Sequence, residues 1–195
     1  GTLTGAGRLE FDRWRLAGYS WGFDLQQVPV RSIPDITAIV SGRLEIRAER
    51  IGAKLVPDVR GTLAVQAGEI RSEFVASGTA AQPVVDTDVP EWLADISLAA
   101  DQGNVWIRNS VVDAELVGNL RFIRRGEGEV QGLVRVKRGT YSYLIHRFEI
   151  TSGELDFSRT GAFFDPELSI EARRGRPGDR TYVTMSGRAS APQLS

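Results

Sequence analysis

The amino-acid sequence predicts an all-β protein made of long strands that each carry one apolar face. A unit Gly-x-Leu-x-apolar recurs along the 195 residues. Apolar and polar residues alternate with period two from one end to the other, whereas no segment sustains a helical periodicity. Clusters of turn-forming residues separate the alternating runs in the second half. The repeated unit occupies residues 7–11, 42–46, 61–65, 118–122 and 153–157.

Each copy of this unit predicts the beginning of a strand. A glycine permits the turn or bend from which a strand departs. Side chains two residues apart in a strand point to the same side of the sheet. Leu120 and Phe122 therefore share one face in the fourth copy, while Arg121 occupies the other.

In the second half, turn signals at 126–128, 151–153 and 175–179 predict consecutive hairpins, and hence an antiparallel meander. The strands expected there span about residues 104–109, 111–123, 129–144, 146–158, 166–174 and 180–189.

In the first half, proline-containing stretches at 28–34 and 55–57 are expected to separate the strands. A linker is predicted at 76–89, which is rich in Ala, Ser, Gly, Asp and Pro, and a short helix is predicted at 91–94. The strands expected in this half span about residues 2–11, 13–20, 36–50 and 59–76.

The domain organisation follows from the repeated unit. The unit occurs on both sides of the linker, so we expect residues 1–195 to form one sheet with an internal break near 76–90 rather than two domains. A start without Met and a proline-containing end lead us to expect a piece of a longer protein.

The composition argues against several classes of partner. The 24 basic and 25 acidic residues leave a formal charge of -1, so no long-range field favours nucleic acid or an anionic membrane surface. The absence of cysteine excludes disulfides and thiolate metal sites. No apolar run approaches the roughly 20 residues that a membrane-spanning helix needs, so we expect no transmembrane segment in this chain.

Groups that carry out catalysis are scarce in this sequence. The single histidine, His146, lies in a strand-like run, and no serine occupies a Gly-x-Ser-x-Gly elbow. Neither a P-loop nor a dinucleotide-binding glycine motif occurs. We therefore expect no enzyme activity, no cofactor and no metal site. Cross-strand ion pairs on a solvated outer face are expected for the basic clusters Arg121, Arg124 and Arg125; Arg135, Lys137 and Arg138; and Arg173, Arg174 and Arg176.

Long strands with one apolar face must hide that face, and the sequence offers no helices to cover it. Three arrangements satisfy this requirement: a closed β-sandwich, a closed barrel, or a sheet curled into an open groove with an apolar lining. The sandwich is the default expectation for such a pattern.

The run 136–157 resembles the C-terminal domain of the TamB family. The family pattern of a Gly-x-Tyr strand, a Phe-x-Ile strand and a Gly-x-Leu-x-Phe strand falls on Gly139, Tyr141, Phe148, Ile150, Gly153, Leu155 and Phe157. The likeness continues in 165–172, and in 105–108 with 114–120, so that it covers about residues 90–195. Family members often have glycine where Ile145 stands and aspartate where Ser169 stands, so we expect a different local bulge geometry and a different contact on the outer face, with the lining unchanged.

The resemblance implies an open, taco-like β-groove of long antiparallel strands with an apolar interior. It also implies a periplasmic segment of an envelope-spanning protein, anchored in the inner membrane of a Gram-negative cell and moving phospholipid to the outer membrane. A phospholipid with about 30 tail methylenes, at roughly 0.8 kcal/mol each, faces about 24 kcal/mol in crossing water. An apolar trough removes most of that barrier without any catalytic group.

Under this hypothesis, phospholipid acyl chains contact the apolar side of each strand. The predicted lining is Leu9, Phe11, Leu44, Ile46, Leu63, Val65, Val105, Ile107, Leu120, Phe122, Val134, Val136, Leu155, Phe157, Leu168, Ile170, Val183 and Met185. A second hypothesis is an assembly module that holds an outer-membrane β-barrel client or partner by groove or edge-strand contact. A structural spacer with a filled core is the third.

Overall fold

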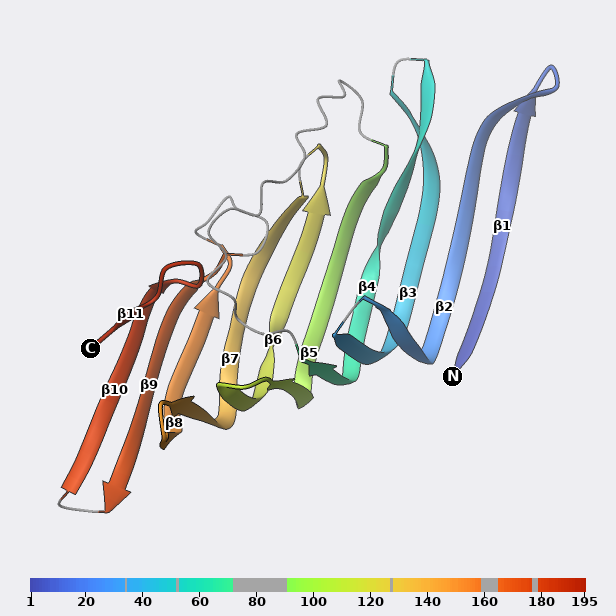
Figure 1. Ribbon diagram of the computed structural model, residues 1–195. Coiled ribbons are helices and arrows are strands. Elements are labelled where there is room, and N and C mark those ends of the chain that lie inside the picture. Colours follow the sequence, from blue (N-terminus) through green and yellow to red (C-terminus); the bar gives the residue numbers. More distant parts are fainter. Residues whose placement is uncertain (34, 52, 72–90, 127, 159–164, 177–178) are drawn as a thin grey trace.

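The computed structural model describes residues 1–33, 35–51, 53–71, 91–126, 128–158, 165–176 and 179–195. Within these ranges the chain forms one eleven-stranded sheet whose spatial order follows the sequence (Figure 1). The strands are β1 (Thr2–Asp12), β2 (Arg15–Ile33), β3 (Ile36–Ile51), β4 (Lys54–Ile70), β5 (Leu93–Arg108), β6 (Val112–Arg124), β7 (Gly128–Tyr143), β8 (His146–Asp156), β9 (Glu167–Arg176), β10 (Asp179–Arg188) and β11 (Gln193–Leu194).

The sheet is open, because β1 pairs only with β2 and β11 only with β10 among the described strands. A single curled sheet, rather than the two packed layers of a sandwich, confirms the groove as the fold class. No helix that could cross a membrane occurs in the described residues.

One strand pair departs from the expected antiparallel arrangement. All neighbours are antiparallel except β4 and β5, which pair in parallel from Asp58 opposite Leu93 to Ile70 opposite Ile107. The predicted linker at 76–89 lies in the connection between these strands and outside the described residues, so it stays a prediction.

The meander predicted for the second half is confirmed from β6 to β10, but the turn predicted at 151–153 is wrong, because these residues lie inside β8. The helix predicted at 91–94 is wrong, because Leu93 and Ala94 already belong to β5. The proline-containing stretches were also expected to separate strands, but β2 runs through Pro29 and β4 through Pro57.

A bulge lets β2 continue past the expected break. Gln27, with φ +53°, is the extra residue just before Val28, and its N–H donates a 2.8 Å hydrogen bond to Ser41 Oγ. Pro29 then lies opposite Ile39 in the β2–β3 ladder. The side-chain hydroxyl of Ser41 thus satisfies a backbone donor that the irregular ladder would otherwise leave unpaired.

The glycines of the repeated unit lie inside strands, so the prediction that they begin strands is wrong. Gly42 is in the middle of β3 and Gly61 in the middle of β4. The two units pair in register, with Leu44 opposite Gly61 and Leu63 opposite Gly42. A Cβ on Gly42, which has φ +149°, would overlap the carbonyl oxygen of Thr62. Glycine is needed there because the neighbouring strand occupies the space of a side chain.

The same pairing recurs between β6 and β7, where Leu120 lies opposite Gly132 and Val134 opposite Gly118. Gly132 has φ +128°, and a Cβ on it would overlap the carbonyl oxygen of Asn119. Large side chains therefore face glycines across both strand pairs. Glycine kinks of this kind are a means by which a sheet acquires curvature.

We expect Gly42→Ala to lower the free energy of unfolding by at least about 1 kcal/mol, because alanine meets both the positive φ and the Thr62 backbone. Gly22→Ala in the adjacent strand is the control, since a Cβ on Gly22 would meet nothing within 4 Å. Chemical denaturation of both variants should leave the control within about 0.5 kcal/mol of the parent. Equal losses in the two variants would contradict the role assigned to Gly42.

Candidate functional site

The pairing registers place the predicted lining residues on one face of the sheet. Residues directly opposite one another in paired strands point to the same side, so a face can be followed from strand to strand. We call this side the apolar face; it carries Leu9, Phe11, Leu44, Ile46, Leu63, Val65, Val105, Ile107, Leu120, Phe122, Val134, Val136, Leu155, Leu168, Ile170, Val183 and Met185. Phe157 follows β8 by one residue and continues its alternation, with its N–H bonded to the Gly132 carbonyl at 2.9 Å.

The apolar face is exposed at one side of the sheet and covered at the other. On β1, Leu3, Leu9 and Phe11 are 58%, 52% and 64% exposed. By contrast, a buried cluster spans β6, β8 and β9 and consists of Ala114, Phe148, Ile150 and Ala172. Side chains from β5, β7 and β10 pack against this cluster. The face therefore combines a core that holds the sheet together with an accessible apolar surface.

Sequence reasoning missed part of this face. Ile96 and Leu98 lie on it, opposite Phe122 and Leu120 of β6. Their alternation with Asp95 and other polar residues was a period-two signal, but the helix expected at 91–94 obscured it. The aromatic residues of β2 were also missed, because that strand carries no copy of the repeated unit; they are Tyr19, Trp21 and Phe23.

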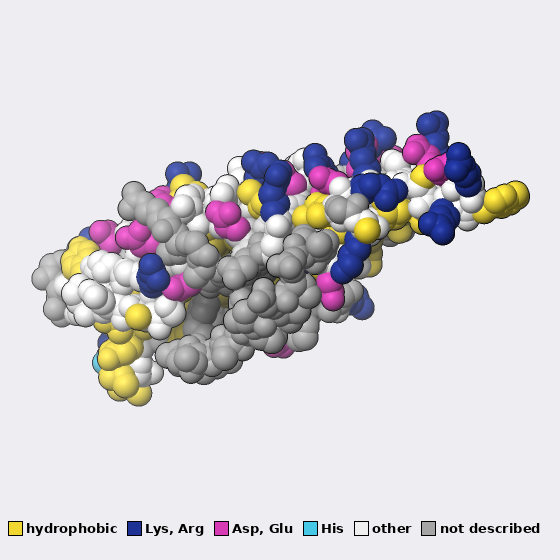
Figure 2. Space-filling view, turned by 90° about the horizontal axis from the view of Figure 1, so that it is seen from above, with side chains coloured by type: hydrophobic (Ala, Val, Ile, Leu, Met, Phe, Trp, Pro, Cys, Tyr) yellow, Lys and Arg dark blue, Asp and Glu magenta, His cyan; other side chains and the backbone are white. Residues whose placement is uncertain are grey.

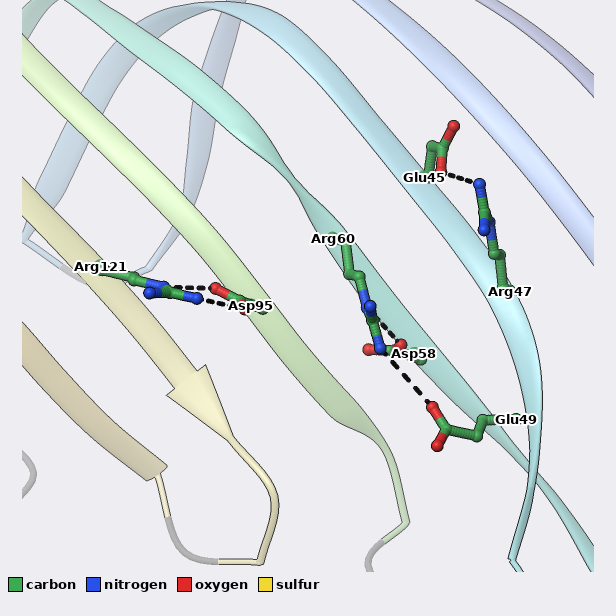
Figure 3. A network of polar contacts seen from close by, with 7 residues as sticks. All are labelled: Glu45, Arg47, Glu49, Asp58, Arg60, Asp95 and Arg121. Carbon is green, nitrogen blue, oxygen red and sulfur yellow. Dashed lines mark hydrogen bonds and ion pairs between the residues drawn. The ribbon is translucent and has the colours of Figure 1, made fainter.

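The opposite side, which we call the charged face, is covered by ion pairs. Lys, Arg, Asp and Glu side chains gather mainly along one long side of the molecule (Figure 2). Arg121 binds Asp95 of the neighbouring strand at 2.6 Å, and Arg60 binds Asp58 at 2.6 Å and Glu49 of β3 at 3.7 Å (Figure 3). Most of these side chains are exposed, so each pair contributes about 0–1 kcal/mol.

The expectation of cross-strand ion pairs on an outer face is confirmed for five of the basic residues, namely Arg121, Arg135, Lys137, Arg138 and Arg173. It is wrong for Arg124, Arg174 and Arg176, the last of which is paired opposite Asp179 on the apolar face. The registers place Arg124 opposite Ala94 and Arg174 opposite Thr181, on the apolar face. Each lies near a strand end, where a long side chain can follow an apolar surface while its charge stays at the margin.

His146, the single histidine, also lies on the apolar face, opposite Tyr143 at the β7–β8 turn. Its Nδ1 contacts the Arg174 guanidinium, which acts as the hydrogen-bond donor when the imidazole is neutral. The described residues contain no group of three or more His, Asp and Glu that could hold a metal ion.

Glu115 is a buried acid on the charged face, with only 5% of its side chain exposed. Its Oε1 accepts hydrogen bonds from the Asn104 backbone N–H at 2.9 Å and from Lys137 Nζ at 3.3 Å, and its Oε2 accepts one from Arg138 Nε at 2.6 Å. These donors, the backbone N–H foremost, lower the pKa of Glu115 from 4.5 to about 2.

The Glu115 carboxylate holds together an irregular part of the sheet. Asn104 has φ +64° and follows Gly103, φ +78°, in the bulge that interrupts β5 between Ala100 and Val105. Lys137 and Arg138 come from the bulge that β7 forms opposite β6. One carboxylate thus ties two bulges to the strand between them.

A hollow of about 660 Å³ also lies on the charged face. Arg147, Glu149, Arg173 and Asp113 line it, together with Trp106, whose ring lies under the Arg138 guanidinium at 5.2 Å. Both signs of charge are present, so the hollow favours neither an anion nor a cation.

We expect Glu115→Gln to destabilise the chain at neutral pH, because the amide cannot accept three charge-assisted hydrogen bonds as a carboxylate does. A folded-state pKa below the unfolded value adds stability that is complete above the unfolded pKa and disappears as pH falls. The difference in unfolding free energy between parent and variant should therefore be constant above pH 4.5 and shrink toward pH 2. Denaturation curves at several pH values measure it, and a difference independent of pH would contradict this role.

Comparison with known proteins extends the resemblance seen in the second half to the entire chain. The family model of the TamB C-terminal domain matches residues 1–195. A comparison with curated proteins finds no match. Because the family model matches the whole chain, the chain belongs to the TamB C-terminal domain family, whose proteins are translocation and assembly modules of the Gram-negative cell envelope.

Proposed function

We propose that the apolar face holds phospholipid acyl chains as they pass between the inner and outer membranes. The observation that carries this proposal is the continuous apolar face, which runs from β1 to β10 with the predicted lining residues all on one side. In this proposal the chain is a periplasmic segment of a longer protein that is anchored in the inner membrane.

The exposed part of the apolar face is what makes it suitable for a ligand. Leu9 and Phe11, with Leu16 and Trp21 of β2, are more than a third exposed and lie on two adjacent strands. Soluble proteins seldom expose contiguous apolar surface of this kind unless something binds to it. Acyl chains fit this surface because their transfer from water is favourable by roughly 0.8 kcal/mol per methylene.

The charged face supports the same proposal, because it gives the sheet a side that is stable in water. Its cross-strand ion pairs link β2 to β9 without a break, as in Arg43 with Asp24 and Arg173 with Glu149. A sheet solvated on one side can present its other side to lipid without a covering layer.

Replacing a lining residue by a charge should block lipid movement and leave the sheet folded. We expect Leu120→Asp and Leu155→Asp in the full-length protein to reduce phospholipid transfer at least about tenfold, because a carboxylate in the trough must be desolvated by each passing tail. Transfer of labelled phospholipid between donor and acceptor vesicles measures the effect, and circular dichroism checks the fold.

The matched control is Asn119→Asp, one residue from Leu120 but on the charged face, opposite Leu133. This variant adds the same charge to the same strand and should transfer lipid at the parent rate. Full transfer by a folded protein that carries both Leu120→Asp and Leu155→Asp would overturn the proposal.

A second candidate function is favoured by the free edge of the sheet. Every residue of β1 is exposed, and the strand pairs on one side only among the described strands. An edge of this kind offers backbone N–H and C=O groups to an added strand. In this reading the chain is an assembly module that holds a strand of an outer-membrane β-barrel protein.

Photo-crosslinking separates the two candidates. A photoreactive residue at Leu120 or Leu155 on the apolar face should label phospholipid, and one at Arg8 on the β1 edge strand should not. Labelling of β-barrel chains from Arg8, with no lipid labelled from the apolar face, would favour the assembly module instead.

A further inference from the structure

The two signs of charge are distributed unequally between the faces. Every Asp and Glu that has a partner in the pairing registers lies on the charged face, with the exception of Asp179 at the start of β10, which is paired opposite Arg176. Basic side chains on the apolar face lie toward strand ends: Arg50, Arg124, His146, Arg174 and Arg176. An apolar surface bordered mainly by cations is complementary to an anionic amphiphile.

Arg124 differs from the other cations in its surroundings. It is the last residue of β6 and lies opposite Ala94, on the apolar face next to Phe122. Its guanidinium lies 4.7 Å from the ring centre of Trp92, whose ring also packs against Phe122 at 6.0 Å. Its Nε is buried and has no hydrogen-bond partner in the described part of the chain.

The contact with the Trp92 ring engages the charge of the guanidinium without using a hydrogen-bond acceptor, which leaves its N–H groups for an anion. A cation over an aromatic face is held by the ring from one side, while its N–H groups point outward in the plane of the guanidinium. That planar edge matches two oxygens of a phosphate in a bidentate arrangement. A buried N–H without a partner costs free energy, and a bound phosphate oxygen would recover it.

The apolar face below Arg124 is long enough for an acyl chain. From Arg124 to Leu116, the positions of β6 on this face are Phe122, Leu120 and Gly118, with no polar side chain among them. Eight residues of strand span about 26 Å at roughly 3.3 Å each. One leaflet of a bilayer has a hydrocarbon thickness of about 15 Å, half of the roughly 30 Å core.

We propose that Arg124, stacked on Trp92, binds the phosphate of a phospholipid headgroup at one end of the apolar face, with the acyl chains lying along Phe122 and Leu120. This inference rests on the proposed lipid-binding function and adds to it a headgroup site of stated chemistry. Arg50 provides a second cation toward the same end of the sheet, where its Nη2 is 3.5 Å from the Ala17 carbonyl oxygen.

The test compares phospholipid with diacylglycerol of the same acyl chains, which lacks the phosphate. The full chain is incubated with detergent-solubilised lipid of each kind, and bound lipid is quantified by native mass spectrometry. Wild-type protein should bind phospholipid more tightly than diacylglycerol. Arg124→Gln should weaken phospholipid binding about tenfold, which is the loss expected when one charge-assisted hydrogen bond is removed. Diacylglycerol binding should be unchanged.

Two variants control this result. Arg125→Gln removes the neighbouring, exposed cation and should bind both lipids as the wild type does. Arg124→Lys keeps the charge but loses the planar fork, so we expect phospholipid affinity between those of the wild type and Arg124→Gln. Inorganic phosphate should compete only weakly with phospholipid for the wild-type protein, because it lacks the acyl chains. If phosphate competes as strongly as the lipid itself, Arg124 belongs to a site for free anions and the headgroup assignment is overturned.

The outcomes also distinguish this inference from the function on which it rests. If Arg124→Gln loses affinity equally for both lipids, Arg124 only supports the structure. If wild-type protein binds both lipids with equal affinity, the phosphate is not recognised. Either result overturns the headgroup site while leaving acyl-chain binding intact. If wild-type protein binds neither lipid, the proposed function fails and this site fails with it.

Discussion

The in-phase alternation of side chains across all paired strands is the constraint on which both faces of this sheet depend. A slip of one residue in any register would carry that strand's apolar side chains to the charged face. The strands are long enough to acquire irregularities, and bulges correct the phase where they occur. In β7, for example, two consecutive residues, Lys137 and Arg138, both contact Glu115 of β6. Because of this extra residue, Val136 and Gly139 on either side of the bulge both lie on the apolar face.

Energetically, the two faces have different roles. Exposed ion pairs on the charged face contribute little individually, and they chiefly specify which strands lie side by side and in which register. Burial on the apolar face supplies most of the stabilisation, and it is concentrated around Phe148 and Ile150. Asp58 and Glu115 are exceptions on the charged face, because both carboxylates are buried, and Glu115 accepts hydrogen bonds from three donors.

A single curled sheet leaves part of its apolar face without a protein partner, and the proposed function uses this uncovered surface. A sandwich would have covered Leu9 and Phe11 with a second layer, but in the described structure they remain more than half exposed. The glycines opposite Leu44 and Leu120 let the strands bend without steric conflict on that side. Curvature and an accessible apolar surface thus arise from the same Gly-x-Leu pattern.

The cations at the margins of the apolar face show how charge can be placed without interrupting an apolar path. Arg124 extends beside Trp92, so that its charge is partly balanced by the aromatic ring. Arg174 is paired with His146 at a different strand end. Alternation alone places both residues on the apolar face, because Arg124 lies two residues after Phe122 and Arg174 two residues after Ala172. Their partners Trp92 and His146 are distant in sequence and were not predicted.

Period-two alternation was sufficient to predict an all-β chain and the side of each strand on which residues such as Leu155 and Val183 lie, because it is a local property of an extended chain. It left the choice between a sandwich, a barrel and an open groove undecided, and the groove was predicted only from the family resemblance. Long-range partners decided the rest. The parallel pairing of β4 with β5, the passage of β2 through Pro29 and the interior position of Gly42 depend on which strand lies alongside and how closely it approaches. The contact of the Arg124 guanidinium with the Trp92 ring likewise depends on a segment distant in sequence, which no local pattern contains.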